Sequence, residues 1–167
     1  MTISLQKTVT SRLGGFKDSN PEILTSYPPL NKDIENSNEL LPLCLPIGCK
    51  KGEVIIDTYE KSTLISYIFS IKGSGDRDDL YSFSILLNKG INPEIYKLVL
   101  KRFIDELEKN GLLKERIFID NQSEIYEKFN QEENIVLEGI DIPLLEIFKE
   151  IKKKYQKKKP KLKGSFL

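Results

Sequence analysis

The amino-acid sequence predicts an α+β fold in which an antiparallel sheet of about five strands is covered by helices. Segments with a strand-like alternation of apolar and polar residues cluster before residue 88. Segments with apolar residues at helical spacing cluster after residue 92. Strands that come first and helices that come last are typical of a layered α+β structure, and 167 residues can bury a substantial core.

The first two strands are expected to form a hairpin with a long loop. Residues 2–11 alternate apolar and polar side chains, so Leu5 and Val9 should share one face of a half-buried strand. A turn-rich connection leads to residues 22–27, which have the pattern of a second strand. Residues 30–39 are polar and have no strong period, although a short helical turn is compatible with them.

Two later strands have clearer patterns. Residues 62–71 and 80–87 are rich in β-branched and aromatic residues and are separated by a charged loop, so they should pair antiparallel. Phe69 lies on the more apolar face of the first strand, and Tyr81 and Phe83 lie on the apolar face of the second. The preceding apolar run, "GEVIIDTYE", leaves its structure open.

The best local signals in the chain predict a helix after these strands. Asn92 can cap the helix, and Pro93 suits its first turn. Apolar residues at helical spacing run from Tyr96 to Leu107, and Gly111 stands where a left-handed C-terminal cap is expected.

Three shorter elements are expected after this helix. "RIFID", residues 116–120, has the composition of a short strand, and Ser123 can cap a brief helix over residues 124–130. Pro143 opens the last helix, whose apolar stripe ends at Tyr155.

Both cysteines lie in the stretch "LLPLCLPIGC", residues 40–49, and could be metal ligands, a redox pair or structural thiols. The sequence has no histidine, so one chain cannot complete a four-ligand zinc site or use Cys-His or Ser-His-Asp catalysis. A disulfide between Cys44 and Cys49 would close a very small loop and gain little chain entropy. We expect a buried, extended edge segment bracketed by Pro42 and Pro46, with Cys44 as a small core residue.

The glycines and aspartates of the charged loop "IKGSGDRDD", residues 71–79, suggest two kinds of ligand site, a phosphate-binding loop and a calcium-binding loop. The segment lacks the spacing of a phosphate-binding loop and precedes a strand rather than a helix. Asp76, Asp78 and Asp79 could suggest calcium, but the closing glutamate of an EF-hand loop is missing. We expect a hairpin loop whose charged tip is available to a partner.

Charge divides the chain into an acidic body and a basic tail. The whole chain carries +1 and the segment from Lys152 to Leu167 carries +8, so residues 1–151 carry −7. This charge distribution suggests a flexible basic tail over 152–167.

The tail has three interpretations: a solvated segment, contact with an anionic membrane or acidic partner, and nucleic-acid binding. Nucleic acid is the least favoured because aromatic residues are sparse there and the body is acidic. Without a long apolar stretch or a signal-peptide core, we expect a cytoplasmic protein. The solvated tail is the most favoured interpretation, and peripheral contact with an anionic membrane belongs to the second. The candidate contact residues are Lys152, Lys153, Lys154, Lys157, Lys158, Lys159, Lys161 and Lys163.

A family resemblance rests on an aromatic-proline pair, a Leu-Pro followed by cysteine and proline, and two aromatic strands. In this order they resemble the upstream part of the DENN module (uDENN), whose fold is a longin domain, over residues 2–111. The resemblance therefore implies a uDENN-like domain over 1–111, with a helical extension over 112–151 packed on it. Leu43 and Leu45 stand where aromatic residues are usual, and Ser82 where glycine is common. The matching packing residues are Tyr27, Pro28, Leu41, Pro42, Cys44, Pro46, Phe69, Tyr81 and Phe83.

The resemblance implies a five-stranded antiparallel sheet with helices on its faces, and a role with small GTPases and membrane trafficking. DENN proteins that resemble exchange factors need a larger central module, and the 56 residues after Gly111 are too few for it. We therefore predict a non-enzymatic, longin-type interaction module without catalytic residues, cofactor or metal, which binds a small GTPase or another longin-type protein. The alternative is a nucleic-acid-associated protein that binds through the lysine tail.

Overall fold

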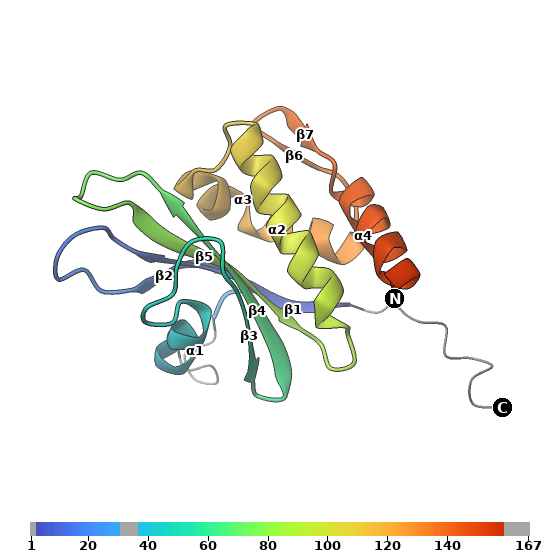
Figure 1. Cartoon of the computed structure of the whole chain (residues 1–167), viewed down its shortest axis with the longest axis horizontal. Coiled ribbons are helices and arrows are strands. Elements are labelled where there is room, and N and C mark those ends of the chain that lie inside the picture. The colour runs from blue at the N-terminus through green and yellow to red at the C-terminus, as the bar shows by residue number, and fades with distance from the viewer. Residues whose placement is uncertain (1–2, 31–36, 159–167) are drawn as a thin grey trace.

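The computed structural model describes residues 3–30 and 37–158 (Figure 1). Within these residues the chain forms a five-stranded sheet, a small two-stranded hairpin and four helices, which confirms the predicted α+β class. Neighbouring strands of the large sheet all pair antiparallel, in the order β2-β1-β5-β4-β3. These strands are β1 (Leu5–Leu13), β2 (Glu22–Tyr27), β3 (Val54–Tyr59), β4 (Ser62–Ile71) and β5 (Asp79–Leu87).

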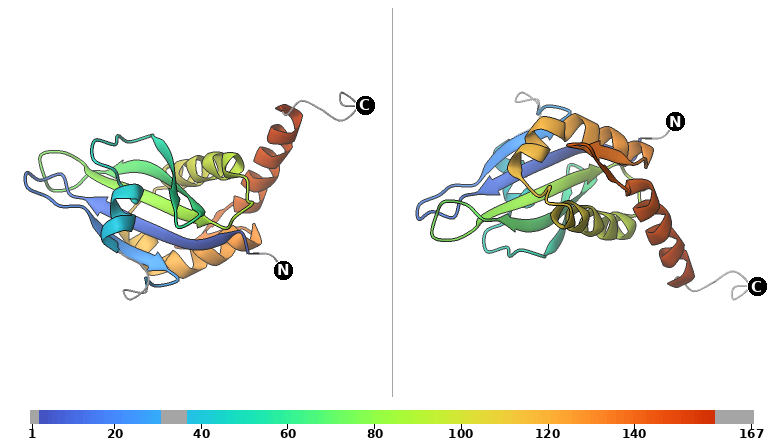
Figure 2. Two further views of the ribbon diagram at one scale, coloured as in Figure 1. Left: turned by 90° about the horizontal axis from the view of Figure 1, so that it is seen from below. Right: turned by 90° about the horizontal axis from the view of Figure 1, so that it is seen from above.

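Helices cover both faces of the sheet (Figure 2). The short α1 packs on one face, and α2 and α3 pack on the other. The hairpin β6–β7 follows α3, and α4 then packs against α2. The elements are α1 (Ser37–Cys44), α2 (Pro93–Lys109), α3 (Glu115–Gln131), β6 (Ile135–Leu137), β7 (Ile140–Ile142) and α4 (Leu144–Lys158).

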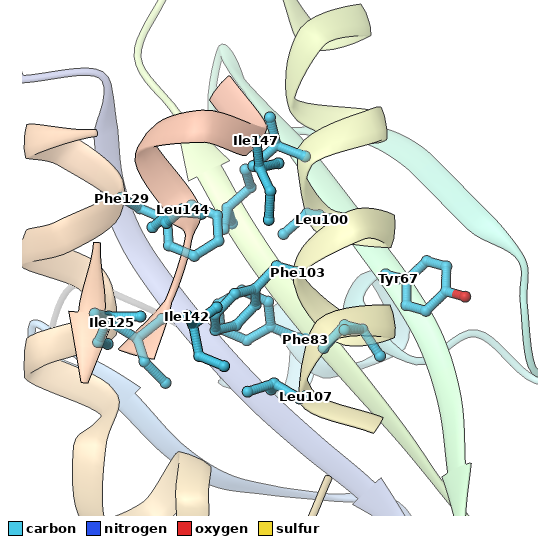
Figure 3. Packing of buried hydrophobic residues seen from close by; sticks show 14 of the residues in the cluster. Tyr67, Phe83, Leu100, Phe103, Leu107, Ile125, Phe129, Ile142, Leu144 and Ile147 are labelled. Atoms are coloured by element: carbon cyan, nitrogen blue, oxygen red, sulfur yellow. The ribbon is translucent and has the colours of Figure 1, made fainter. Parts of the chain in front are cut away.

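The larger core lies between the sheet and α2, α3 and α4, and its centre is aromatic (Figure 3). The ring of Phe83 on β5 lies 5.9 Å from that of Phe103, 5.6 Å from that of Phe118 and 5.8 Å from that of Phe129, measured between centroids. These partners come from α2 and α3, so one strand residue joins both helices to the sheet. Rings at such separations attract one another beyond the gain from burial.

The strongest helix prediction is confirmed in detail. The backbone N–H of Glu94 donates to the Asn92 side chain at 2.9 Å, and Pro93 occupies the first turn of α2. The predicted stripe from Tyr96 to Leu107 is buried. Gly111 follows the helix with a φ of +69°, a left-handed conformation that glycine adopts without steric strain.

The prediction that Leu5 and Val9 share a face is wrong. The pairing of β1 with β5 shifts register between Leu5 and Lys7, which is the signature of a β-bulge. An inserted residue reverses the alternation of side chains. Leu5 therefore joins the larger core, whereas Val9 packs under α1 on the opposite face.

The extended edge segment predicted for residues 40–49 is also wrong. The chain is helical to Cys44, with Pro42 inside α1, and a turn follows. Leu40, Leu43 and Cys44 have the i, i+3, i+4 spacing of one helix face, and all three contribute to a small cluster with sheet residues. A strand would have sent Leu43 and Cys44 to opposite faces.

The short strand predicted over residues 116–120 does not form. Residues 115–131 make a single helix, α3, with a kink at Asn121, whose φ of −124° and ψ of 16° are not helical. Ile117, Ile125 and Phe129 recur at helical spacing and are buried in the larger core, which explains why helix wins over strand here.

Candidate functional site

The outer edge of β3 is the candidate functional site. β3 is the last strand at one end of the sheet, and it pairs with β4 on its inner side. Glu60 and Lys61 join the two strands in a two-residue turn, and both have positive φ. Within the described residues, no strand pairs with the outer side of β3.

Alternate residues of β3 direct their main-chain groups outward. The pair that closes a two-residue antiparallel hairpin exchanges hydrogen bonds, and every second pair does so along the ladder. The closing pair is Tyr59 with Ser62, so the register turns the main-chain groups of Val54, Ile56 and Thr58 away from β4. The outward Thr58 N–H donates to Asp57 Oδ1 at 2.7 Å, which agrees with this direction.

The side chains at this edge are suited to a partner strand. Val54, Ile55 and Ile56 form a β-branched run, and Ile56 is 41% exposed. The main-chain N–H and C=O groups of Val54 and Ile56 have no partner strand within residues 3–30 and 37–158. An added strand would satisfy these groups and cover the Ile56 side chain.

An acidic hollow of about 320 Å³ lies near the N-terminal end of β3. It is lined by α2 and by the part of β4 that continues beyond its pairing with β3. Tyr67 of β4 lines this hollow, and its charged lining residues are Asp105 and Glu108 of α2 and Lys51, so acids outnumber bases. Burial and the two carboxylates raise the pKa of Tyr67. The hollow therefore favours a neutral or basic side chain from a bound partner.

The opposite edge of the sheet is less open because α3 packs on β2. Arg12 of β1 donates to Glu22 of β2 at 2.6 Å and to Glu115 of α3 at 2.8 Å. Tyr81 donates to the same Glu115 at 2.9 Å, and burial together with this bond raises the pKa of Tyr81. These contacts tie β2 to the domain, so β3 is the better candidate for strand addition.

The three aromatic packing residues predicted from the strands come together in the larger core. Phe69 and Tyr81 are stacked with ring centroids 5.5 Å apart. Phe69 and Phe83 both contact the ring of Phe118 on α3. These residues hold α3 on the sheet and are not at the β3 edge.

The remaining predicted packing residues are dispersed. Tyr27 and Pro28 lie at the end of β2, and the Tyr27 ring is 5.3 Å from that of Tyr126. Pro42 is inside α1, and Pro46 follows that helix. The pattern that carries the resemblance therefore maps to packing positions on several elements rather than to one site.

Cys44 is a buried free thiol, as predicted, and Cys49 is a half-buried free thiol. Burial raises the pKa of the Cys44 thiol to about 11, although the Ser84 side chain acts in the opposite direction. Burial and then Glu53 raise the pKa of Cys49. Both thiols are therefore held in the protonated, weakly nucleophilic form near neutral pH.

Cys44→Ala is expected to cost about 1–2 kcal/mol of stability near pH 7 through lost packing, and to reduce the alkaline loss of stability. The folded chain keeps the Cys44 proton up to about pH 11, whereas an unfolded thiol releases it near pH 9. The unfolded state binds fewer protons in this interval, so wild-type stability falls as the pH rises from about 9 to 11. Between about pH 7.5 and pH 10.5, urea denaturation should show wild type losing roughly 2 kcal/mol more than Cys44→Ala. Cys49→Ser should change the free energy of unfolding little. If wild type and Cys44→Ala lose equal stability between about pH 7.5 and pH 10.5, the Cys44 thiol is not the cause of the alkaline loss.

The lysines predicted to contact an anionic surface differ in their environments. Lys152 donates to the two carboxylate oxygens of Glu132 at 2.6 and 2.7 Å, so this lysine is fixed against the domain. Lys153 and Lys154 are exposed on α4. Lys157 and Lys158 belong to α4, whereas Lys159, Lys161 and Lys163 lie outside the described residues.

The charged loop of residues 71–79 is a hairpin connection, as expected, and it packs against the β1–β2 loop. The Arg77 N–H donates to the Gly15 carbonyl at 3.3 Å, and the Gly15 N–H donates to Asp79 Oδ1 at 2.7 Å. A Cβ on Gly15 would overlap the Arg77 carbonyl oxygen, so the close approach requires glycine.

Two kinds of feature are absent from the described part of the chain. In residues 3–30 and 37–158, no three side chains of His, Cys, Asp or Glu are grouped as metal ligands. Among the same residues, no helix combines the length and the apolar character needed to cross a bilayer.

No protein-family model matches this chain, and no curated protein matches its sequence. A proposal of function therefore depends on the β3 edge, the adjoining hollow and the pattern of packing residues.

Proposed function

We propose that this chain is a non-enzymatic, longin-type interaction module that acts with small GTPases or the membrane-trafficking machinery. The observation that carries the proposal is the unpaired outer edge of β3, with its exposed Ile56 and outward main-chain groups. Helices cover both faces of the sheet, so this edge offers the sheet a way to continue into another molecule.

The partner proposed for this edge is a small GTPase or a second longin-type protein. The support is the resemblance to uDENN, which implies an antiparallel five-stranded sheet with helices on its faces, and that layout is present here. A partner strand would gain main-chain hydrogen bonds along β3, and the acidic hollow would select the side chain that enters beside Tyr67.

A pull-down of small GTPases from the same organism, in both nucleotide states, and of longin-type proteins tests the function. Ile56→Pro tests the edge, because proline removes an outward N–H and leaves the bonds from β3 to β4 in place. Ile56→Val keeps that N–H and most of the side chain, so it is the matched control. We expect wild type and Ile56→Val to bind the same partner and Ile56→Pro to bind about tenfold more weakly or worse.

Two outcomes would overturn these statements separately. If no GTPase in either state and no longin-type protein binds, the proposed function fails. If a partner binds Ile56→Pro as tightly as wild type, while thermal melting shows both variants folded, the interaction lies elsewhere on the surface.

A binding measurement with labelled DNA and RNA distinguishes the nucleic-acid alternative from the interaction-module proposal. Salt-sensitive binding of the wild type that is lost in Lys159→Gln/Lys161→Gln/Lys163→Gln would favour that alternative. Under the interaction-module proposal, wild type and this variant should both show no such binding.

A further inference from the structure

A second hollow, of about 390 Å³, lies between α2 and α4 and is not part of the β3 edge. Its apolar side chains are Leu98 from α2 and Ile151 and Tyr155 from α4. Its charged side chains are Lys101, Arg102, Asp105 and Lys154. We call this hollow the α2–α4 groove.

Two of the three apolar side chains that line this groove, Leu98 and Tyr155, are only partly buried. Leu98 stands outside the buried stripe of α2 and is 47% exposed. The apolar stripe of α4 continues past the buried Ile151 to Tyr155, which is only half-buried. Figure 2 shows why, because the C-terminal end of α4 projects beyond the body of the domain. The described residues therefore leave one side of this apolar strip uncovered.

The rim of the groove is basic. Lys101 and Lys154 are exposed and make no ion pair within the described residues. Arg102 is paired with Glu150 at 3.2 Å, and Asp105 is the single acid that lines the groove. The two ammonium groups come from different helices, and both line the groove beside its apolar side chains.

Charge complementarity decides between the available occupants. The chain's own segment 159–167 carries lysines and no acid, and a second copy docked symmetrically through the same groove would present the same basic rim, so both would meet like charges. A flat bilayer surface cannot fill a hollow between two helices, whereas an amphipathic helix can. Acidic residues beside its apolar stripe would reach Lys101 and Lys154.

We propose that the α2–α4 groove is a docking site for an acidic amphipathic helix of a partner protein. Apolar residues of that helix at i, i+3 or i+4, and i+7 contact Leu98, Ile151 and Tyr155, and its carboxylates pair with Lys101 and Lys154. The site does not depend on strand addition at β3. Because Asp105 borders both hollows, one partner can reach both surfaces across the exposed side of α2.

The test is fluorescence anisotropy of a labelled, designed amphipathic peptide with leucines in one stripe and glutamates beside them. The same peptide with lysine in place of glutamate is the ligand control. The full-length chain should bind the glutamate peptide at least about tenfold more tightly than the lysine peptide at low salt. Lys101→Glu/Lys154→Glu should weaken binding of the glutamate peptide by about tenfold or more.

A charge-matched control variant tests whether the loss of affinity comes from the groove or from the change in net charge alone. Lys109→Glu/Lys149→Glu makes the same change in net charge on the same two helices, outside the groove, and should alter the affinity by less than about threefold. Leu98→Ala should weaken binding severalfold without a charge change. All four lysines and Leu98 are at least partly exposed, so these variants are expected to fold, which circular dichroism checks.

Three results would overturn the proposal: equal binding of the two peptides, equal loss in the two lysine variants, or no loss in Lys101→Glu/Lys154→Glu. Vesicles of phosphatidylcholine with phosphatidylserine provide a separate arm. Groove-dependent binding to these vesicles, without binding of the glutamate peptide, would assign the groove to a membrane and would also overturn it. Ile56→Pro should bind the glutamate peptide as wild type does, so failure at the β3 edge and failure at this groove are distinguishable.

Discussion

Replacing Phe83 with alanine is expected to lower the free energy of unfolding by about 3–5 kcal/mol. The Phe83 side chain is fully buried, and its ring contacts those of Phe103, Phe118 and Phe129. Removing the ring deletes three aromatic contacts and leaves a cavity where the sheet meets α2 and α3. Urea denaturation followed by circular dichroism measures the change as a lower transition midpoint.

Phe16→Ala is the matched control for Phe83→Ala. Phe16 is 51% exposed in the β1–β2 loop, so the same substitution there should change stability by about 0.5 kcal/mol or less. If Phe83→Ala does not fold, Phe83→Leu keeps most of the apolar volume and should show a smaller loss of about 1–2 kcal/mol. A loss below about 1 kcal/mol for Phe83→Ala would contradict its place at the centre of the core.

The parts of the fold that the sequence predicts are those whose signals are local. β4 and β5 are buried on both faces, but their β-branched and aromatic residues identify them as strands, and the buried stripe of α2 has helical spacing. Asn92 and Gly111 mark the ends of α2 because caps depend on adjacent residues. Alternation in β1 fails as a guide because a bulge changes the face, and the bulge is visible only in the pairing with β5.

The sequence misses elements in which residue type and structure disagree. Pro42 and Pro46 suggest a broken strand, but the burial of Leu40 and Cys44 against the sheet stabilises a short helix there. β-Branched and aromatic residues before Asn121 suggest a strand, yet packing on Phe83 makes that segment helical. In each case tertiary contacts override local preference.

The candidate site could be predicted only in part. The run "GEVIIDTYE" has the composition of a strand, but the turn after it is Glu60-Lys61 rather than the Asn-Gly that marks a hairpin. Which residues of β3 direct N–H groups outward depends on register, and no single-chain pattern encodes register directly. The α2–α4 groove needs two helices distant in sequence, although Leu98 outside the apolar stripe of α2 is a visible signal.

Gln122→Ala is expected to lower the free energy of unfolding by about 2–3 kcal/mol, because it breaks a buried polar link between α3 and β1. Thr10 Oγ1 donates to Gln122 Oε1 at 3.0 Å, and Gln122 Nε2 donates to Thr8 Oγ1 at 2.9 Å. All three side chains are buried. Thr8 keeps its bond to the Tyr27 carbonyl, so the main penalty falls on the Thr10 hydroxyl, which loses its acceptor. Gln131→Ala, at an exposed position on the same helix, should be nearly neutral in the same urea denaturation.

A further variant shows whether the loss comes from an unpaired hydroxyl or only from lost packing. Thr10→Val/Gln122→Leu removes the donor and its acceptor together and keeps most of the buried volume, so it should recover much of the stability that Gln122→Ala loses. Recovery would mean that the glutamine specifies how α3 docks on β1 more than it stabilises the fold, because an apolar pair does not require one fixed alignment. If the double variant is as unstable as Gln122→Ala, the hydrogen bonds themselves hold α3 against the sheet, and the penalty does not arise from an unsatisfied Thr10.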